Sequence, residues 1–245
     1  MPVRRDERRT LARALAQHVA GLRAVGVTAV PVRTSRPGEE VVRGGGGPAG
    51  TTNAERLARL VREVEACRRC PLYRTRTHAV VSDGTPEAKL MFIGEAPGRD
   101  EDLQGKPFVG AAGQLLTKMI EAMGLKREAV YICNVLKDRP PGNRTPLPEE
   151  MEACLPFLQE QIRIVQPSVI CLLGAVAAKA LLGPYVSITK IRGETREYEG
   201  IPVIPTFHPA YLLRNPPAKR FVWEDLKKVK ALLQGQGAWG TGQGP

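Results

Sequence analysis

The segment 94–110 combines four acidic residues, four glycines and a single aromatic residue, Phe108. An apolar run at 90–93 precedes it and is typical of a buried strand, and the apolar spacing at 114–120 that follows is helical. A strand, a loop and a helix in this order place the loop at the carboxyl edge of an open α/β sheet, where such sheets bind ligands. Carboxylates, glycines and one aromatic side chain suit a pocket that holds a flat polar ring and does chemistry beside it.

Polar residues also end two later apolar runs. Asn134 lies near the carboxyl end of an otherwise apolar strand, where a polar side chain needs a reason. His208 follows the run 203–207 and precedes Pro209. Each has a plain structural interpretation, Asn134 as the cap of a nearby loop and His208 as a structural loop histidine. In the functional interpretation, both belong to the sheet edge that carries 94–110.

The elements that must position these residues alternate along the chain. Apolar runs predict strands, and helical patterns separate them and follow the last. The first helix begins after Thr52, a plausible N-cap. The expected strands are 90–93, 130–135, 169–173 and 203–207, and the expected later helices are 113–123, 148–165, 174–182 and 219–234. This order predicts an α/β fold, a three-layer α/β/α sandwich with a central, mainly parallel four-stranded sheet.

Composition limits the class of protein. The formal charge of +11 indicates a polyanionic partner, nucleic acid first, and a basic solvated surface without a partner is the alternative. The sequence contains no apolar run of about eighteen residues, so we expect no membrane span. The charged N-terminus lacks an apolar signal core. We therefore expect a cytoplasmic protein.

Three segments differ in character. Residues 1–52 are basic and rich in Gly and Pro, with a linker-like glycine run at 44–47, and are expected to be a disordered extension. Such an extension either tethers DNA or has no function. Residues 53–234 are the expected folded domain, and 235–245 a flexible tail.

The five cysteines, an odd number, favour metal binding or free thiols over a disulfide framework. Cys67 and Cys70 have the spacing of a metal-binding knuckle. Cys171 lies in an apolar run and is expected in the core. Side chains alternate along strands, so Cys133 faces away from the pocket if Asn134 faces into it.

Three motifs in order resemble the family 4 uracil-DNA glycosylases. They are the segment 94–110, the run 131–137 with the loop 139–144, and the segment 208–216. The resemblance covers about residues 54–234, and the first fifty residues have no counterpart in it. It implies an enzyme that flips uracil out of DNA and hydrolyses the N-glycosidic bond, leaving an abasic site.

The resemblance implies how the base is held. Phe108 stacks on the flipped uracil, although a loop phenylalanine folded into the core is the alternative. Asn134 both donates and accepts, which matches O4 and N3–H of uracil and rejects cytosine. His208 donates to O2 as negative charge builds on the leaving base. Backbone groups of Glu95, Ala96 and Pro97 touch the base.

The water-activating group is open between Glu95 and Glu101, and we expect the two to act together. Family 1 enzymes carry an aspartate where this chain has Ala96. Because the sugar is already cationic in the transition state, a nearby carboxylate can help by electrostatics alone. The motifs suggest no Schiff-base lysine, so the enzyme is expected to be monofunctional.

The DNA surface is expected around two basic positions and an apolar pair. Leu212 and Leu213 are candidates for a wedge into the base stack, with Arg214 holding a phosphate. Arg144 is a further DNA-binding candidate. The expected partner is uracil-containing DNA, single- or double-stranded, bound by a monomer.

An iron–sulfur cluster is also implied by the resemblance. Its ligands would be Cys67, Cys70 and Cys154, with Asp138 where the family has its third cysteine. A [4Fe–4S] cluster with Asp138 as oxygen ligand, a [3Fe–4S] cluster on three thiolates, and zinc in a Cys₃Asp site are the alternatives.

Two other functions stay open from the sequence. One is a DNA-binding or damage-sensing module that kept the fold without the chemistry. The other is a glycosylase that prefers another deaminated base, such as hypoxanthine or xanthine.

Overall fold

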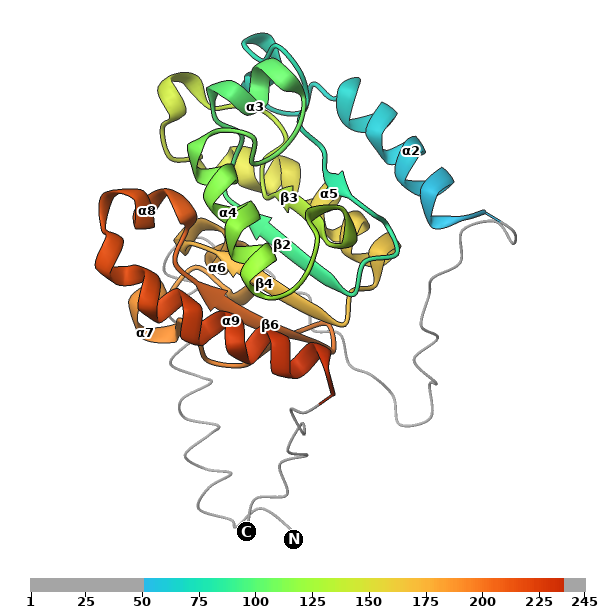
Figure 1. The fold of residues 1–245 in the computed structure, drawn as a ribbon. Helices are drawn as coiled ribbons and strands as arrows, with labels where there is room; N and C mark the ends of the chain where they lie inside the picture. The colour runs from blue at the N-terminus through green and yellow to red at the C-terminus, as the bar shows by residue number, and fades with distance from the viewer. Residues whose placement is uncertain (1–50, 236–245) are drawn as a thin grey trace, which may run out of the picture. The chain divides into compact units, whose positions relative to one another are not determined.

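The computed structural model describes residues 51–235 (Figure 1). The predicted basic extension (1–52) and flexible tail (235–245) lie outside the described part except for residues 51, 52 and 235. Thr52 caps the first described helix, α2 (Asn53–Glu65), as the sequence predicted. Its hydroxyl accepts from the backbone N–H of Glu55, and the Glu55 carboxylate accepts in turn from the N–H of Thr52.

A six-stranded sheet of order β1-β3-β2-β4-β6-β5 forms the centre of the described domain. The four inner strands are parallel and match the four predicted strands. The two edge strands, β1 and β5, pair antiparallel and were not predicted, because β1 has two residues and β5 is short and largely exposed. The strands are β1 (Asp83–Gly84), β2 (Leu90–Gly94), β3 (Tyr131–Asn134), β4 (Val169–Leu173), β5 (Arg196–Tyr198) and β6 (Ile201–Thr206).

Helices cover both faces of this sheet, as predicted for a three-layer sandwich (Figure 1). The predicted helices are α4 (Ala111–Ala122), α5 (Pro148–Val165), α6 (Ala175–Leu182) and α9 (Lys219–Leu233). Three short helices were not predicted: α3 (Arg99–Gln104), α7 (Ile188–Ile191) and α8 (Pro209–Arg214). The segment 94–110 is therefore a helix between two loops. Single turns of 3₁₀ helix are η1 (Pro71–Arg74), η2 (Arg127–Ala129), η3 (Pro141–Asn143) and η4 (Pro216–Ala218).

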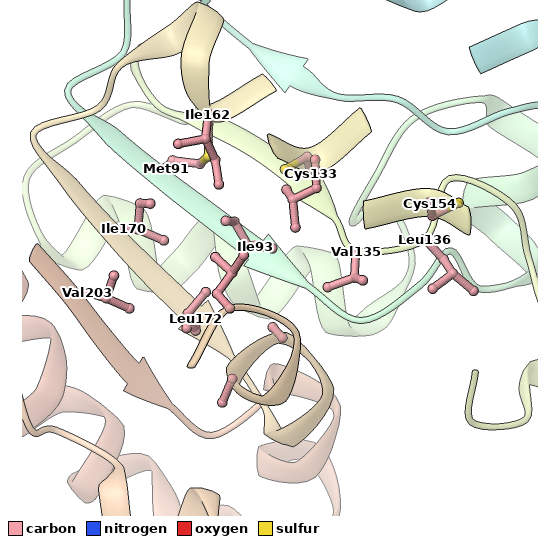
Figure 2. Close-up of a cluster of buried hydrophobic side chains, with 14 of the residues drawn as sticks. Met91, Ile93, Cys133, Val135, Leu136, Cys154, Ile162, Ile170, Leu172 and Val203 are labelled. Carbon is pink, nitrogen blue, oxygen red and sulfur yellow. The ribbon is translucent and has the colours of Figure 1, made fainter. Parts of the chain in front are cut away.

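Alternation along the buried strands divides the core into two layers. In β2, Met91 and Ile93 pack toward α5 and α6, whereas Leu90 and Phe92 pack toward α4 and α9. Figure 2 shows residues of the first layer, among them Met91 and Ile93 of β2, Cys133 of β3 and Ile162 of α5. Because both faces are covered, the inner strands are apolar throughout, apart from Asn134 and Thr206 near their carboxyl ends.

No helix among residues 51–235 has both the length and the apolar character needed to cross a membrane.

Candidate active site

A pocket of about 530 Å³ opens at the carboxyl edge of the parallel strands. All three sequence motifs contribute to it, because the ends of β2, β3 and β6 meet there. Its lining residues are Glu95, Ala96, Pro97, Gly98, Arg99, Asp100, Glu101, Phe108, Gly110, Ala111, Ala112, Asn134, Pro140, Asn143, Arg144, His208, Ala210, Tyr211 and Arg214.

Asn134 ends β3 directly opposite Gly94 of β2. Its side chain is buried, with 1% of the residue exposed, and lines the pocket. Among the described residues its Oδ1 is the buried side-chain polar atom that has no hydrogen-bond partner. A buried acceptor without a donor costs free energy, so this atom is suited to receive a donor from a ligand.

Gly94 leaves room for the two side chains beside it. A Cβ at Gly94 would lie 2.3 Å from Oδ1 of Asn134 and 2.4 Å from Cζ of Phe108. Both distances are far below van der Waals contact. The absence of a side chain at Gly94 therefore lets the amide and the ring approach each other.

Phe108 lies in a strained loop. Its φ is +55°, which residues other than glycine rarely adopt. The ring packs into the core layer under α4 and also lines the pocket, so the functional and the core interpretations of the sequence both describe part of its environment. Its centroid lies 5.6 Å from that of the His208 ring, with a tilt of 31°.

His208 caps α8, and its ring orientation is fixed by the backbone. Nδ1 accepts a hydrogen bond of 3.2 Å from the N–H of Ala210. In the neutral ring the proton therefore resides on Nε2, which is left as a donor. Burial, with a smaller contribution from the charge of Arg214, lowers the pKa of His208 to about 4. The imidazole is neutral at physiological pH.

The Glu101 carboxylate accepts hydrogen bonds from backbone amides before and after α3, the helix that carries it. One carboxylate oxygen accepts from Val109 and Gly110, both at 2.9 Å, and the other accepts from Gly98 at 3.1 Å. This carboxylate holds the loop that carries Phe108.

Glu95, the other predicted carboxylate, follows β2 and lines the pocket beside Ala96 and Pro97. Burial raises the pKa of Glu95. Two further residues of the same segment, Arg99 and Asp100, also line the pocket and were not singled out from the sequence. They lie on the short helix α3, which was not predicted because the glycines at both of its ends are typical of a loop.

The residues predicted to contact DNA differ in their surroundings. Leu213 is 46% exposed, whereas Leu212 is 1% exposed and packs under α4 and α9, so the wedge prediction is corrected for Leu212. Arg214 is exposed and lines the pocket. Arg144 lies on the rim, where it donates to both carboxylate oxygens of the buried Glu150, at 2.8 and 2.6 Å.

The predicted metal ligands Cys67, Cys70, Asp138 and Cys154 share one region of the domain. The charge of Asp138 raises the thiol pKa values of Cys70 and Cys154, after the larger effect of burial, so the three groups are neighbours. Both oxygens of Asp138, however, accept from Nη1 of Arg76, at 2.8 and 3.0 Å. In residues 51–235, no group of three or more His, Cys, Asp or Glu is arranged to hold a metal ion. The ion pair with Arg76 engages both oxygens of Asp138, and Asp138 as an oxygen ligand of a cluster stays a prediction.

The other two cysteines lie where the sequence predicted, Cys133 from strand alternation and Cys171 from its apolar run. Cys133 packs against α5 in the layer of Figure 2, on the opposite side of β3 from the pocket, and Cys171 is buried in the other layer. The expectations that Cys133 faces away from the pocket and that Cys171 lies in the core are confirmed.

Comparison with known proteins relates this arrangement to a family. A model described as the uracil DNA glycosylase superfamily matches residues 81–227. A type-4 uracil-DNA glycosylase of Thermotoga maritima is 50% identical over 188 residues, which cover 75% of this chain and 98% of the relative. Type-4 uracil-DNA glycosylases of Archaeoglobus fulgidus (45% identical, 73% of this chain, 94% of the relative) and Sulfurisphaera tokodaii (46%, 72% and 84%) are also similar.

Proposed function

The chain belongs to the uracil-DNA glycosylase superfamily, and we propose that it is a DNA-repair enzyme that hydrolyses the bond between uracil and deoxyribose. The products are free uracil and an abasic site. Water adds to C1′ of the sugar, the electrons of the C1′–N1 bond leave with the base, and the proton that the water loses ends on the uracil anion.

The observation that carries this proposal is Oδ1 of Asn134, a buried atom without a hydrogen-bond partner on a residue that lines the pocket. Uracil presents an N3–H donor beside its O4 acceptor, which complements the oxygen and nitrogen of one amide. Cytosine has an acceptor at N3 and a donor at C4. It would leave the buried Oδ1 without a donor, which supports discrimination against it.

In this proposal Phe108 contacts the flat face of the base and His208 contacts its O2 edge. The Phe108 ring stacks on the flipped uracil, and Nε2–H of His208 donates to O2, where negative charge builds as the bond breaks. A neutral histidine suits this role, because its donor is fixed by the bond from Ala210 to Nδ1.

Glu95 is the carboxylate we propose to act beside the sugar. Its pKa is raised by burial, and it lines the pocket, whereas both oxygens of Glu101 are engaged by backbone amides. Glu101 then contributes by holding the loop. The described residues that line the pocket include no lysine, which supports a monofunctional enzyme that forms no Schiff base.

DNA is the proposed partner, bound by a monomer at the pocket mouth. The net charge of +11 and the position of Arg214 support contact with phosphates, and Leu213 beside Tyr211 supplies an exposed apolar surface that can enter the base stack. We propose that the enzyme acts in the cytoplasm on the DNA of the nucleoid.

An iron–sulfur cluster stays a proposal that rests on the resemblance and on three thiols, Cys67, Cys70 and Cys154. Anaerobic purification followed by analysis of iron and acid-labile sulfide tests it, and stoichiometric zinc instead of iron would contradict it. Cys133→Ser is expected to keep the parental metal content, because Cys133 packs in the core.

The assay that tests the function uses oligonucleotides with one uracil, followed by alkali to cleave abasic sites. We expect cleavage at uracil in single- and double-stranded DNA, and none at cytosine or thymine. Matched hypoxanthine and xanthine oligonucleotides distinguish the alternative base preference. Binding without cleavage of any of them would favour the inactive module.

A further inference from the structure

We propose that Arg127 is a positioning residue that holds Phe108 in the pocket, an inference that rests on the proposed stacking role of Phe108. Arg127 belongs to η2, just before β3, and is absent from the residues that line the pocket. Its effect on the reaction would therefore pass through the loop that carries the ring.

The guanidinium of Arg127 connects three separate segments. Nη2 donates to the carbonyl oxygen of Pro107 at 2.8 Å, directly before Phe108. Nε donates to the carboxylate of Asp83 at 2.9 Å, and Nη1 donates to the hydroxyl of Thr117 on α4 at 3.0 Å. The Arg127 side chain is 20% exposed. Through it, the carbonyl of Pro107 is linked to Asp83 of β1 and Thr117 of α4.

The loop needs this support because the backbone of Phe108 is strained. Its φ of +55° is unfavourable for a residue with a side chain and persists only where the surroundings impose it. Glu101 fixes the far side of the residue through the amides of Val109 and Gly110. Arg127 fixes the near side through Pro107. The two together hold Phe108 between a donor before it and an acceptor after it.

The backbone behind Phe108 is also closely packed. A Cβ at Gly113 would lie 1.9 Å from the carbonyl oxygen of Phe108, so α4 and the loop already touch. Loss of the bond from Arg127 would free Pro107 and let Phe108 relax to a common φ. The ring would then leave its place beside Asn134 and His208, and each substrate molecule would have to restore it.

A double-mutant cycle tests this coupling in the full chain. We expect Arg127→Met to lower the single-turnover rate of uracil excision about tenfold, and Phe108→Ala to lower it at least as much. In the Phe108→Ala background, Arg127→Met should have no further effect, because its target is gone. Arg127→Lys should recover part of the rate, since an ammonium can still donate to one of the three acceptors.

Arg56→Met is the matched control. Arg56 has the same 20% side-chain exposure and forms an ion pair with Glu160, and neither residue lines the pocket. We expect the parental rate from this variant. Equal losses from Arg127→Met in the two backgrounds, or the parental rate in Arg127→Met alone, would overturn the proposal.

A second measurement does not depend on activity. Hydrogen exchange should show faster exchange of the Val109 and Gly110 amides in Arg127→Met, and unchanged exchange in Arg56→Met. Unchanged exchange in Arg127→Met would overturn the positioning role even if uracil excision is confirmed. Faster exchange in a chain without uracil activity would support the structural part of the inference and reject the function on which it rests.

Discussion

Nη1 of Arg76 donates to both carboxylate oxygens of Asp138, at 2.8 and 3.0 Å, and the two side chains are 12% and 5% exposed. The same guanidinium donates to the carbonyls of Val64 and Glu65, at the end of α2. The ion pair therefore joins the end of α2, the segment after η1 and the loop after β3. A cluster on Cys67, Cys70 and Cys154 would connect this same region of the domain.

We expect Asp138→Asn to leave the iron content per chain at the parental value, because Asp138 is paired with Arg76. The variant should lose about 2 kcal/mol of unfolding free energy, since a largely buried guanidinium keeps no charged partner. Arg76→Met should lose a similar amount, and the double variant less than the sum. Iron analysis and thermal unfolding measure these quantities.

Glu224→Gln is the control, because Glu224 pairs with Lys227 on the surface and contributes little. A fall in iron content in Asp138→Asn, with parental iron in Arg76→Met, would make Asp138 a ligand.

Asn134→Ala and His208→Ala should each lower the single-turnover rate by roughly tenfold to a thousandfold, the range for one lost transition-state donor. DNA affinity should change little, because phosphate contacts dominate it. Quench-flow and equilibrium binding separate the two. Parental rates in both variants would place the chemistry elsewhere.

His208 should make stability depend on pH below neutrality. Its pKa falls from 6.5 in the unfolded chain to about 4 in the folded protein, so the unfolded chain binds the proton first as pH decreases. The contribution is complete above pH 6.5 and is lost between about 6.5 and 4, at roughly 1.4 kcal/mol per pH unit. Urea unfolding at several pH values should show a shallower decline in His208→Gln, and equal slopes would refute the shifted pKa.

Gly94→Ala should fold but lose most of its activity. The new methyl would lie 2.3 and 2.4 Å from Asn134 and Phe108, so these side chains must move out of place. We expect at least a tenfold lower kcat/KM, and circular dichroism shows whether the fold is kept. A folded variant with parental kcat/KM would mean that the two side chains can shift without consequence for the base.

Leu213→Ala and Leu212→Ala should separate contact with DNA from packing. Leu213 is exposed, so its truncation should slow excision from duplex DNA more than from single strands and leave the melting temperature unchanged. Leu212 is buried, so its truncation should cost about 2–5 kcal/mol of stability. Equal effects of Leu213→Ala on both kinds of DNA would argue against the wedge.

The sequence by itself determined the layers of the fold and the place of the site. Apolar runs separated by helical patterns gave the four inner strands in parallel order, and parallel strands bring their carboxyl ends to one edge. That rule placed 94–110, Asn134 and His208 together. The two-residue period of a strand also predicted that Cys133 faces away from the pocket once Asn134 faces into it.

Only the tertiary structure decided the partners of the charged residues. Asp138 and Arg76 are 62 positions apart, Arg127 and Pro107 are 20 apart, and nothing in local periodicity relates them. It also decided which leucine of α8 is exposed, since six residues are too few to define an apolar face. A local pattern records which side of an element is buried, whereas the match between a donor and an acceptor depends on where distant segments meet.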